Sequence, residues 1–433
     1  MKKQLLLISL SLLLIAIYPT TIYAQLNFEK TYQAVINSVG ASYARQTTDG
    51  GYILCGDKVI KTNQYGDTTW TKPISFGHVI KQTADGNYIT GGNGLVKLSS
   101  TGAQIWATST SCVGISETSD GGYITTSAAG LMLEKRNATG TIQWTSGNFG
   151  VPGIMSESWS AIQSPGGGYL LSGTRKDNAF DSQIMVGKVD SAGNSVWAKL
   201  YGNTSYSDYG NEIINTTDGG TLLIGTVSSN SFDMYLIKQS AAGVTQWTKT
   251  LGGAEPDGGY GIAQTTDGGY IAVGTSKSFA THGGADVYLV KTDAGGTEQW
   301  HKSFGGSGDD YGFSVQQTSD GGYIIAASKD AQTSSPKIYL IKTNASGSTA
   351  VEDYPNQINM ELYPNPATDY ITIESELQKY NYQVMDITGK QLLSGNVNTN
   401  KFNLDISAFS KGIYFISIYN GDQQTVHKMI IKE

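Results

Sequence analysis

Residues 314–327 read SVQQTSDGGYIIAA: an alternating run, an Asp-Gly-Gly-Tyr signature and a second apolar run. Asp-Gly between two such runs predicts a β-hairpin, because aspartate and glycine tolerate the positive φ angles that a twisted hairpin requires. The signature, with variants, occurs seven times along the chain, at intervals of 35 to 53 residues. The copies begin at Asp49, Asp85, Asp120, Gly166, Asp218, Asp267 and Asp320.

Each copy continues into two further strand-like runs. The third run ends in a basic residue, as in residues 235–238 (YLIK), and the fourth carries a tryptophan. The repeat tryptophans are Trp70, Trp106, Trp144, Trp197, Trp247 and Trp300. Four antiparallel strands in a unit of this length are typical of a β-propeller blade. The sequence therefore predicts an all-β fold, with a seven-bladed β-propeller over residues 25–343.

The seventh unit lacks a tryptophan-bearing strand of its own. Residues 28–32 (FEKTY) align with residues 247–251 (WTKTL), with Phe28 in the place of Trp247. We therefore predict that an N-terminal strand near residues 27–32 pairs with the last blade and closes the ring. Closure removes the open strand edges that invite aggregation.

Residues 300–312 (WHKSFGGSGDDYG), followed by the signature at Asp320, resemble the repeat of bacterial seven-bladed β-propeller proteins. In that family a large residue, Gly-Gly and Asp-Asp-Tyr open a unit. Residues 251–275 match similarly well, whereas the first three units are shorter and lack the Gly-Gly entry. The family is defined by its fold, so the resemblance implies no single activity.

Residues 1–24 have the features of a secretory signal peptide. A basic start precedes an apolar run from Leu5 to Ile17, and cleavage is expected between Ala24 and Gln25. The apolar run is too short to span a bilayer, and no stop-transfer pattern follows it. No integral membrane segment is therefore expected after the signal is removed.

The composition of the chain changes after residue 343. Residues 344–360 are polar and contain Pro355, as expected of a linker. Residues 361–433 then carry short alternating runs at the spacing of a small Ig-like β-sandwich. Five pieces occur there in order: Asn-Pro at 365–366, Asp-x-x-Gly-Lys at 386–390, Leu-Asp-Ile-Ser at 404–407, Gly-Ile-Tyr at 412–414 and a basic, apolar end at 428–432.

In this order the five pieces resemble the C-terminal type A sorting domain of the type IX secretion system of Bacteroidota. The resemblance implies that the leader directs passage through the inner membrane, and that the type IX machinery then recognises the tail at the outer membrane. It also implies that the tail is removed and that the protein is secreted or attached to the outer cell surface. A plain Ig-like adhesive module is the alternative. The sorting-signal residues that the resemblance implies are Asn365, Pro366, Gly389, Gly412, Tyr414 and Lys428.

The charge of the chain bears on its partners, and the positions of its cysteines bear on whether they form a disulfide. The formal net charge is −7 and there is no basic patch, which argues against a nucleic-acid partner. The two cysteines, Cys55 and Cys112, fall in the first and third units, which are not neighbours. We therefore predict two buried thiols rather than a disulfide.

The two faces of the predicted ring differ. The face that carries the Asp-Gly-Gly turns, here called the turn face, is uniform from unit to unit. The opposite face, here called the loop face, carries connections of variable length. Variable loops on a rigid scaffold commonly hold binding sites. We therefore predict a ligand site on the loop face of the fourth to seventh units, near the central channel.

Acidic residues recur on the loop face, and two interpretations of them remain open. Several carboxylates together are suited to calcium or to a cationic substrate. Alternatively, the same side chains cap backbone N–H groups beside the glycines. No other cofactor is expected and no metal ligand is assigned. The candidate acids are Asp208, Asp257, Asp309 and Asp310.

Aromatic residues are the other candidates on the loop face. Trp159 is the one tryptophan outside the repeat position, and Tyr209, Tyr260 and Tyr311 fall at neighbouring unit entrances. Their rings are suited either to stacking on sugars or to packing between blades.

The leading functional hypothesis is a secreted or cell-surface, adhesin-like protein that binds a polysaccharide or another surface protein. One alternative is a glycoside hydrolase or lyase with two acids at the propeller channel. Another is a structural surface component. No catalytic residue is assigned, because the four histidines are scattered and the chain has no nucleophile elbow or phosphate-binding loop.

Overall fold

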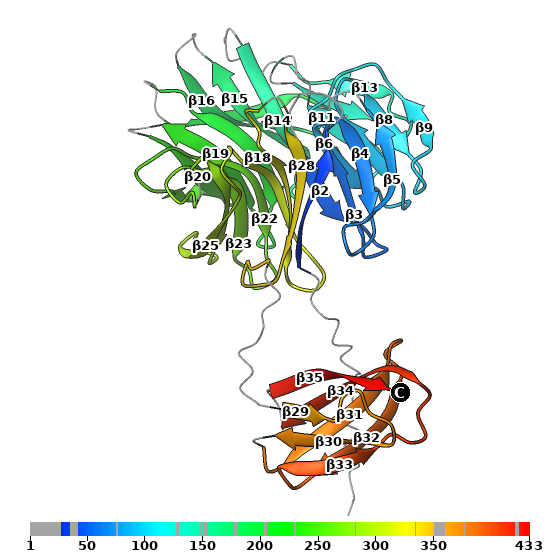
Figure 1. The fold of residues 1–433 in the computed structure, drawn as a ribbon. Helices are drawn as coiled ribbons and strands as arrows, with labels where there is room; N and C mark the ends of the chain where they lie inside the picture. Colours follow the sequence, from blue (N-terminus) through cyan, green and yellow to red (C-terminus); the bar gives the residue numbers. More distant parts are fainter. Residues whose placement is uncertain are drawn as a thin grey trace, which may run out of the picture. The chain divides into compact units, whose positions relative to one another are not determined.

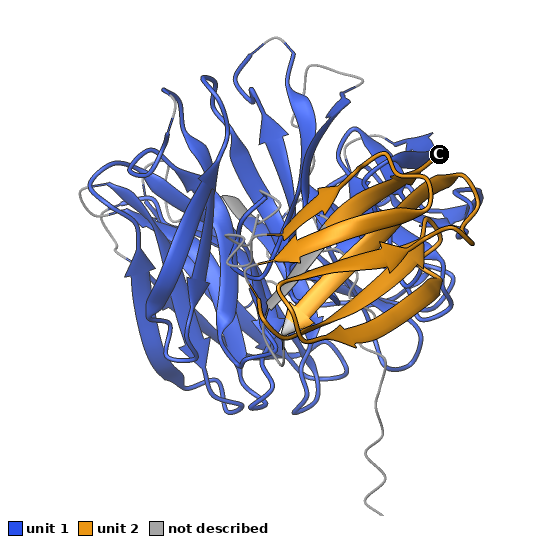
Figure 2. Ribbon diagram, turned by 60° about the horizontal axis from the view of Figure 1, so that its bottom comes forward, with its two compact units in different colours: residues 1–351 blue, residues 352–433 orange. Residues whose placement is uncertain are grey.

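The computed structural model describes residues 27–34, 42–74, 77–126, 130, 132–147, 149, 155–176, 181–202, 206–228, 231–281, 283–333, 335–349, 360–375, 377–420 and 424–433. Within these residues every regular element is a strand (Figure 1). The chain divides into two compact units, residues 1–351 and 352–433 (Figure 2). The expected cleavage site at Ala24 and Gln25 lies outside the described residues.

The first unit contains seven four-stranded antiparallel sheets, the blades of a propeller (Figure 1). Blade one consists of β2 (Tyr43–Gln46), β3 (Tyr52–Cys55), β4 (Lys58–Thr62) and β5 (Thr68–Pro73). Blade two consists of β6 (Val79–Gln82), β7 (Tyr88–Gly91), β8 (Leu95–Leu98) and β9 (Gln104–Ala107). Blade three consists of β10 (Gly114–Glu117), β11 (Tyr123–Thr126), β12 (Leu133–Arg136) and β13 (Ile142–Thr145). Blade four consists of β14 (Met155–Gln163), β15 (Tyr169–Lys176), β16 (Ser182–Val189) and β17 (Ser195–Tyr201). Blade five consists of β18 (Tyr209–Asn215), β19 (Thr221–Ser228), β20 (Phe232–Gln239) and β21 (Thr245–Leu251). Blade six consists of β22 (Asp257–Gln264), β23 (Tyr270–Ser276), β24 (Asp286–Thr292) and β25 (Glu298–Phe304). Blade seven consists of β26 (Tyr311–Gln317), β27 (Tyr323–Lys329), β28 (Lys337–Thr343) and β1 (Phe28–Gln33).

The first strands of the blades form the inner wall of the ring. The strands β2, β6, β10, β14, β18, β22 and β26 contact one another in this order, and β26 also contacts β2. The wall is therefore closed around a central channel. The predicted all-β fold with a seven-bladed β-propeller is confirmed.

The two ends of the propeller sequence meet in blade seven. β1 pairs antiparallel with β28, with Phe28 opposite Lys342 and Gln33 opposite Lys337. β1 is thus the outermost strand of this blade, and β28 is hydrogen-bonded on both sides. No edge of β28 remains open for pairing with another chain.

Aromatic ring pairs join successive blades at six of the seven junctions among the described residues, and blade five has Thr221 in place of the tyrosine. Trp70 in β5 packs against Tyr88 of the following blade, with ring centroids 5.9 Å apart. Phe28 in β1 packs in the same way against Tyr52, also at 5.9 Å. A Cβ atom on Gly66, which has φ of 76°, would stand 2.8 Å from the Phe28 ring, so only glycine allows this approach. Phe28 thus occupies the place that a tryptophan holds in the other blades.

The cysteines are not linked. Cys55 and Cys112 are both buried and both free. The prediction of two buried thiols is confirmed.

The second unit is a small sandwich of two antiparallel sheets. One sheet has the order β29-β30-β33 and the other β32-β31-β34-β35. The strands are β29 (Met360–Tyr363), β30 (Tyr370–Ser375), β31 (Tyr380–Asp386), β32 (Gln391–Val397), β33 (Lys401–Asp405), β34 (Gly412–Asn420) and β35 (Gln424–Lys432). Alternate side chains such as Ile371, Ile373, Val384 and Ile416 are fully buried in the core of this unit. This is the predicted Ig-like β-sandwich.

Candidate ligand-binding site

β-Bulges alter the inner wall in the later blades. The register of β14 shifts at Trp159, that of β22 at Tyr260 and that of β26 at Phe313, so each of these residues is the extra one in its strand. The pairing of β18 has a longer irregularity over Asn211 and Glu212. A bulge re-aims the side chain of the extra residue. The inner strands of blades one to three have four residues each and a regular register.

Three predicted tyrosines lie near one another on the inner strands: Tyr209 and Tyr311 begin β18 and β26, and Tyr260 is the fourth residue of β22. Burial raises the pKa of Tyr260, and the nearby hydroxyl groups of Tyr311 and Tyr209 raise it further. Tyr260 also packs against Phe313 of the next blade, with ring centroids 5.7 Å apart. Tyr209 packs against Phe232 of its own blade at 6.4 Å. The structure therefore gathers aromatic rings from three successive blades.

Trp159 is in β14 of blade four, next to the blade that carries Tyr209. Its side chain is 39% exposed, and its ring contacts His78 with centroids 6.5 Å apart. His78 directly precedes β6 of blade two, whereas Trp159 is in blade four. Because these blades are not neighbours, the contact marks a place where side chains converge on the central channel.

The predicted acids of the blade entrances are buried. Asp310 accepts the N–H of Gly306 at 2.7 Å through one oxygen and that of Asp330 at 2.8 Å through the other. Asp257 makes the equivalent two bonds in the preceding blade. Asp208 accepts the equivalent backbone N–H one blade earlier. These carboxylates hold the entrance loop and the loop after the second strand together.

Asp309 and an acid that was not predicted, Asp286, complete this region. Asp309 accepts a backbone N–H of the loop before β24. Asp286 is fully buried, and its Oδ1 has no hydrogen-bond partner among the described residues. Asp286 Oδ1 and Asp310 Oδ2 lie 2.2 and 2.4 Å from the point where a Cβ atom would stand on Gly305. The two carboxylates therefore lie close together on the Cβ side of this glycine.

The acids do not gather into a larger cluster in the part of the chain that the structure describes. No three His, Cys, Asp or Glu side chains there converge as a metal ion requires. The four predicted acids instead accept backbone N–H groups.

An ion pair crosses the central channel. Glu212 Oε1 accepts the hydroxyl of Tyr43 at 3.0 Å and lies 3.3 Å from Arg45 Nη2. Glu212 Oε2 accepts the N–H of Ile262 at 2.9 Å. Tyr43 and Arg45 belong to blade one and Glu212 to blade five, so their contact bridges blades that do not touch along the wall. We call this set of three side chains the channel bridge.

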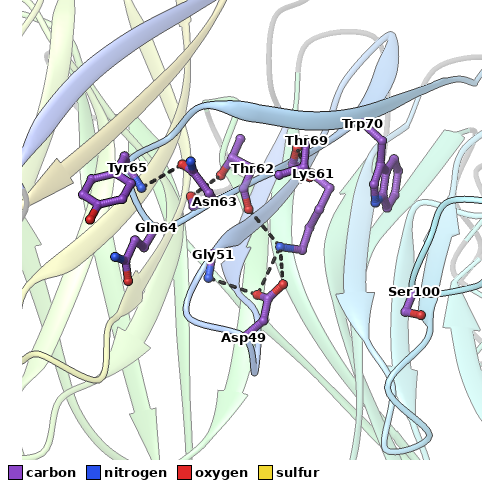
Figure 3. Close-up of a pocket in the computed structure, with 10 residues that line it drawn as sticks. All are labelled: Asp49, Gly51, Lys61, Thr62, Asn63, Gln64, Tyr65, Thr69, Trp70 and Ser100. Atoms are coloured by element: carbon purple, nitrogen blue, oxygen red, sulfur yellow. Dashed lines mark hydrogen bonds and ion pairs between the residues drawn. The ribbon is translucent and has the colours of Figure 1, made fainter. Parts of the chain in front are cut away.

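A repeated ion pair organises the turn face, and Figure 3 shows it in blade one. Asp49 accepts the N–H of Gly51 at 3.0 Å and pairs with Lys61 Nζ at 2.8 Å. The surrounding pocket has a volume of about 390 Å³ and reaches Tyr65 and Trp70. The lysine side chain is only 5% exposed. The equivalent pairs are Lys97–Asp85, Lys135–Asp120, Lys238–Asp218, Lys291–Asp267 and Lys342–Asp320. Because this arrangement recurs, it belongs to the scaffold.

Several of these residues escaped the sequence analysis. The recurrent lysine at the end of the third strand was visible, and its match to the turn aspartate could have been inferred from their common repeat. Phe313, Glu212 and Arg45 gave no such signal, because each lies inside an ordinary strand pattern. Asp286 stands at the start of a strand, and nothing in its local sequence marks its partner.

The opening of the second unit is joined to its last strand. Asn365 Nδ2 donates to the carbonyl of Met429 at 2.7 Å, and its Oδ1 accepts the N–H of Ile431 at 2.8 Å. Ala367 and Lys432 form a parallel bridge beside them. Pro366 lies between these contacts. The Asn-Pro motif thus fixes the end of β35 to the sheet that begins at β29.

The other predicted sorting residues have local structural roles or are exposed. Gly389 has φ of 83° in a turn whose N–H groups bond to the Asp386 side chain. Tyr414 is buried and its hydroxyl donates to the carbonyl of Ser410 at 2.7 Å. Gly412 begins β34, and Lys428 is exposed on β35.

Comparisons with known proteins agree with this division. Residues 361–432 match the family model described as the secretion system C-terminal sorting domain. No curated protein matches the chain by sequence. Among the described residues, no helix has the length and apolar character needed to cross a membrane.

Solved structures resemble the fold at low identity. The extracellular domain of the one-component system BT4673 from B. thetaiotaomicron has a TM-score of 0.54 at 11% identity; the match covers 91% of this chain and 57% of that one. This chain thus spans less than two thirds of that relative. A catalytically inactive virginiamycin B lyase from Staphylococcus aureus, solved with quinupristin, has a TM-score of 0.52 at 9% identity; the match covers 73% of this chain and 99% of the lyase. At such identities the likeness concerns the fold alone.

The fold identifies the first unit, and the family match identifies the second. Residues 361–432 are a secretion system C-terminal sorting domain that follows a seven-bladed β-propeller, in a protein that the type IX secretion system exports for release or for attachment to the cell surface.

Proposed function

We propose that the protein is an extracellular interaction protein that binds a glycan at the loop-face mouth of the propeller channel. The observation that carries this proposal is the set of bulges that bring Trp159, Tyr260 and Phe313 to equivalent positions of the inner wall. Tyr209 and Tyr311, from the blades on either side, lie near Tyr260. We call these five side chains the aromatic mouth.

The geometry of the aromatic mouth suits a sugar ring. Trp159 and Tyr209 are 39% and 38% exposed, so each ring offers an apolar face to solvent while its base is held by a packed strand. Rigid aromatic rings lose little conformational entropy when a ligand stacks on them. Binding sites commonly combine such rings with a few fixed polar groups. Asn211, whose Nδ2 donates to the carbonyl of Gly259 at 2.6 Å, is one polar group fixed in the same wall.

The predicted acids Asp257 and Asp310 do not favour a hydrolase at this site. A glycosidase needs one carboxyl group free to give a proton and a second free to act as base or nucleophile. Both oxygens of Asp257 and both oxygens of Asp310 accept backbone N–H groups. Binding without cleavage is therefore the activity that we propose.

A glycan array with the purified protein tests the proposal, with reducing-sugar release measured on every glycan that binds. We expect binding without release. Trp159→Ala and Tyr209→Ala should each weaken binding by roughly tenfold, as expected for the loss of one stacked ring. Tyr65→Ala is the matched control, because Tyr65 is also exposed but lies in a turn on the opposite face.

Three results would contradict the proposal. Sugar release by the protein would replace it with the enzyme hypothesis. Silence across the array, together with capture of a surface protein, would replace it with protein binding. Equal losses in the Tyr65 variant and the mouth variants would remove the site from the loop face.

A further inference from the structure

A second cavity lies deeper in the propeller channel. It has a volume of about 400 Å³ and is lined by the channel bridge together with Lys81, Gln316 and Gln46. Gln46 and Gln316 are at or near the ends of inner strands that enter the Asp-Gly-Gly turns. The cavity therefore extends from the channel bridge toward the turn face, and none of the five residues of the aromatic mouth lines it.

The charges around this cavity do not balance. Arg45 and Lys81 are cationic, whereas Glu212 is the one acid that lines the cavity in the described part of the chain. Glu212 is already engaged through both oxygens, by Tyr43 and Arg45 on one side and by the N–H of Ile262 on the other. The wall thus holds one more positive charge than negative charge.

Lys81 is the cation without a carboxylate in contact. Its Nζ donates to Ser116 Oγ at 3.0 Å, and no carboxylate of the described residues lies within ion-pair distance of it. Burial and the nearby Arg45 guanidinium lower the pKa of Lys81 to about 8, and the more distant Glu212 offsets part of that shift. Desolvating an ammonium group is costly unless a counter-charge meets it. An anion in the cavity would supply that counter-charge.

Two amides add hydrogen-bond donors to the same wall. Gln46 Oε1 accepts the N–H of Ser319 at 2.8 Å, and Gln316 Oε1 accepts the N–H of Gln46 at 2.9 Å. Because each amide oxygen is held by a backbone N–H, the nitrogen of each amide is the end available to a ligand. Two cations and two amide donors around one cavity form a site for a polar anion.

We infer that this cavity binds a small hydrophilic carboxylate of about the size of one sugar acid, through the Lys81 ammonium group, with Arg45 adding positive charge to the same wall. A carboxylate accepts from the Lys81 ammonium group and from the amide nitrogens. Arg45 contributes positive charge rather than a free fork, because its Nη1 donates to the carbonyls of Ala44 and Val315 and its Nη2 lies against Tyr43 and Glu212. A volume of about 400 Å³ holds such a molecule with some water. The inference is independent of the glycan site proposed for the aromatic mouth.

Isothermal titration calorimetry of the purified protein with sodium D-glucuronate tests the inference, with succinate, glucose and inorganic phosphate titrated alongside. We expect saturable glucuronate binding with a dissociation constant of roughly a millimolar, as usual for a ligand of this size. Lys81→Met should weaken it by about tenfold, because one charge-assisted hydrogen bond is lost. Lys302→Met is the matched control, since Lys302 is exposed on the outer strand β25.

A second measurement does not depend on a variant that folds. The native protein is acetylated at low reagent concentration, with and without glucuronate, and each lysine is followed by mass spectrometry. Glucuronate should slow the acetylation of Lys81 and leave that of Lys302 unchanged.

The outcomes separate the sources of the carboxylate and bound the inference. Tighter binding of glucuronate than succinate supports a sugar acid, and equal binding supports recognition of the carboxylate alone. If neither glucuronate nor succinate binds, the inference is wrong. If phosphate binds as tightly as glucuronate, the ligand is not specifically a carboxylate. If Lys81→Met binds glucuronate with unchanged affinity and glucuronate does not slow the acetylation of Lys81, the site is not at Lys81.

Discussion

Asp310, at the entrance of blade seven, is a buried carboxylate that lies close to the buried carboxylate of Asp286. Burial raises the pKa of Asp310, opposed in part by the N–H groups of Asp330 and Gly306. The folded chain therefore holds this proton more tightly than the unfolded chain does. The contribution of Asp310 to stability is full below its ordinary pKa of 3.8 and is lost as the pH rises through the folded value.

Asp286→Asn is expected to stabilise the propeller at neutral pH. An asparagine keeps one oxygen for the N–H of Thr281, which Asp286 Oδ2 now accepts at 2.7 Å. Its nitrogen then replaces the oxygen that has no partner and donates toward Asp310. We expect a gain of about 1 kcal/mol in the free energy of unfolding, measured with urea at pH 7.

Asp293→Asn is the control for this prediction. Asp293 caps an exposed turn, where its Oδ1 accepts the N–H groups of Gly295 and Thr297. It contacts no other carboxylate among the described residues, so no gain is expected. A loss of stability in Asp286→Asn would show that the charge of Asp286 is needed, for instance for a bound cation.

At the scale of the blade, the lysine–aspartate pair is the repeated unit of the turn face, and blade four lacks it. Gly166 stands where the other six turns have aspartate. Lys188 is opposite Trp197 in blade four, as Lys238 is opposite Trp247 in blade five. The lysine of blade four is therefore present without its turn carboxylate.

Gly166→Asp should supply the missing partner. The position has open space, since the nearest atom to an added Cβ is 3.9 Å away. We expect a gain of about 1 kcal/mol, from the lower entropy of the unfolded chain and from the new ion pair. Gly166→Ala isolates the first of these contributions. Equal stability of the two variants in urea titrations would exclude a contribution from the pair.

The turn aspartates also predict how the propeller responds to acid. Hydrogen bonds from Lys238 and Thr216 lower the pKa of Asp218 to about 2. In Asp120 and Asp267, hydrogen bonds from the turn and its lysine outweigh burial and lower the pKa to about 2 as well. These groups bind protons less tightly in the folded chain, so their contribution is present above pH 3.8 and is lost as the pH falls toward 2.

Urea titrations at several values between about pH 5 and pH 2.5 check this sign. The midpoint should fall as the pH decreases. Asp218→Asn should give a shallower decline, because one of the titrating groups is gone. A midpoint that rises over this range would contradict the assignment of stability to the turn pairs.

The scale of the blade also shows which features of the fold could be predicted from the sequence. The hairpins and the packing of Trp70 or Trp300 could be predicted, because each depends on residues that recur at fixed spacing. The bulges at Tyr260 and Phe313 could not, since a one-residue register shift depends on how a strand pairs with its neighbour. The channel bridge could not be predicted for a related reason. Tyr43 and Glu212 meet only because the ring closes.

At the scale of the whole molecule, the pairing of β1 with β28 couples the first and last strands of the propeller. Deleting residues 27–33 leaves β28 with an open edge and removes the ring of Phe28 from Tyr52 and Gly66. We expect the propeller to unfold at a temperature lower by at least about 5 °C. Differential scanning calorimetry measures the change.

Removal of residues 352–433 is the matched control for that deletion. These residues form their own compact unit, so the propeller transition should keep its temperature. An N-terminal deletion that unfolds at the original temperature would argue that β1 adds nothing to the closed ring.

The position of β28 in its blade has a mechanical consequence. This strand is the last of the propeller before the sorting domain, and it is hydrogen-bonded to β27 on one side and to β1 on the other. A tether attached beyond residue 343 would pull along β28 and load both ladders in shear. Rupture then requires many hydrogen bonds to fail together, whereas an outermost strand could be peeled away one bond at a time. A protein displayed on a cell surface through its C-terminal side would thus resist drag by the same pairing that closes its ring.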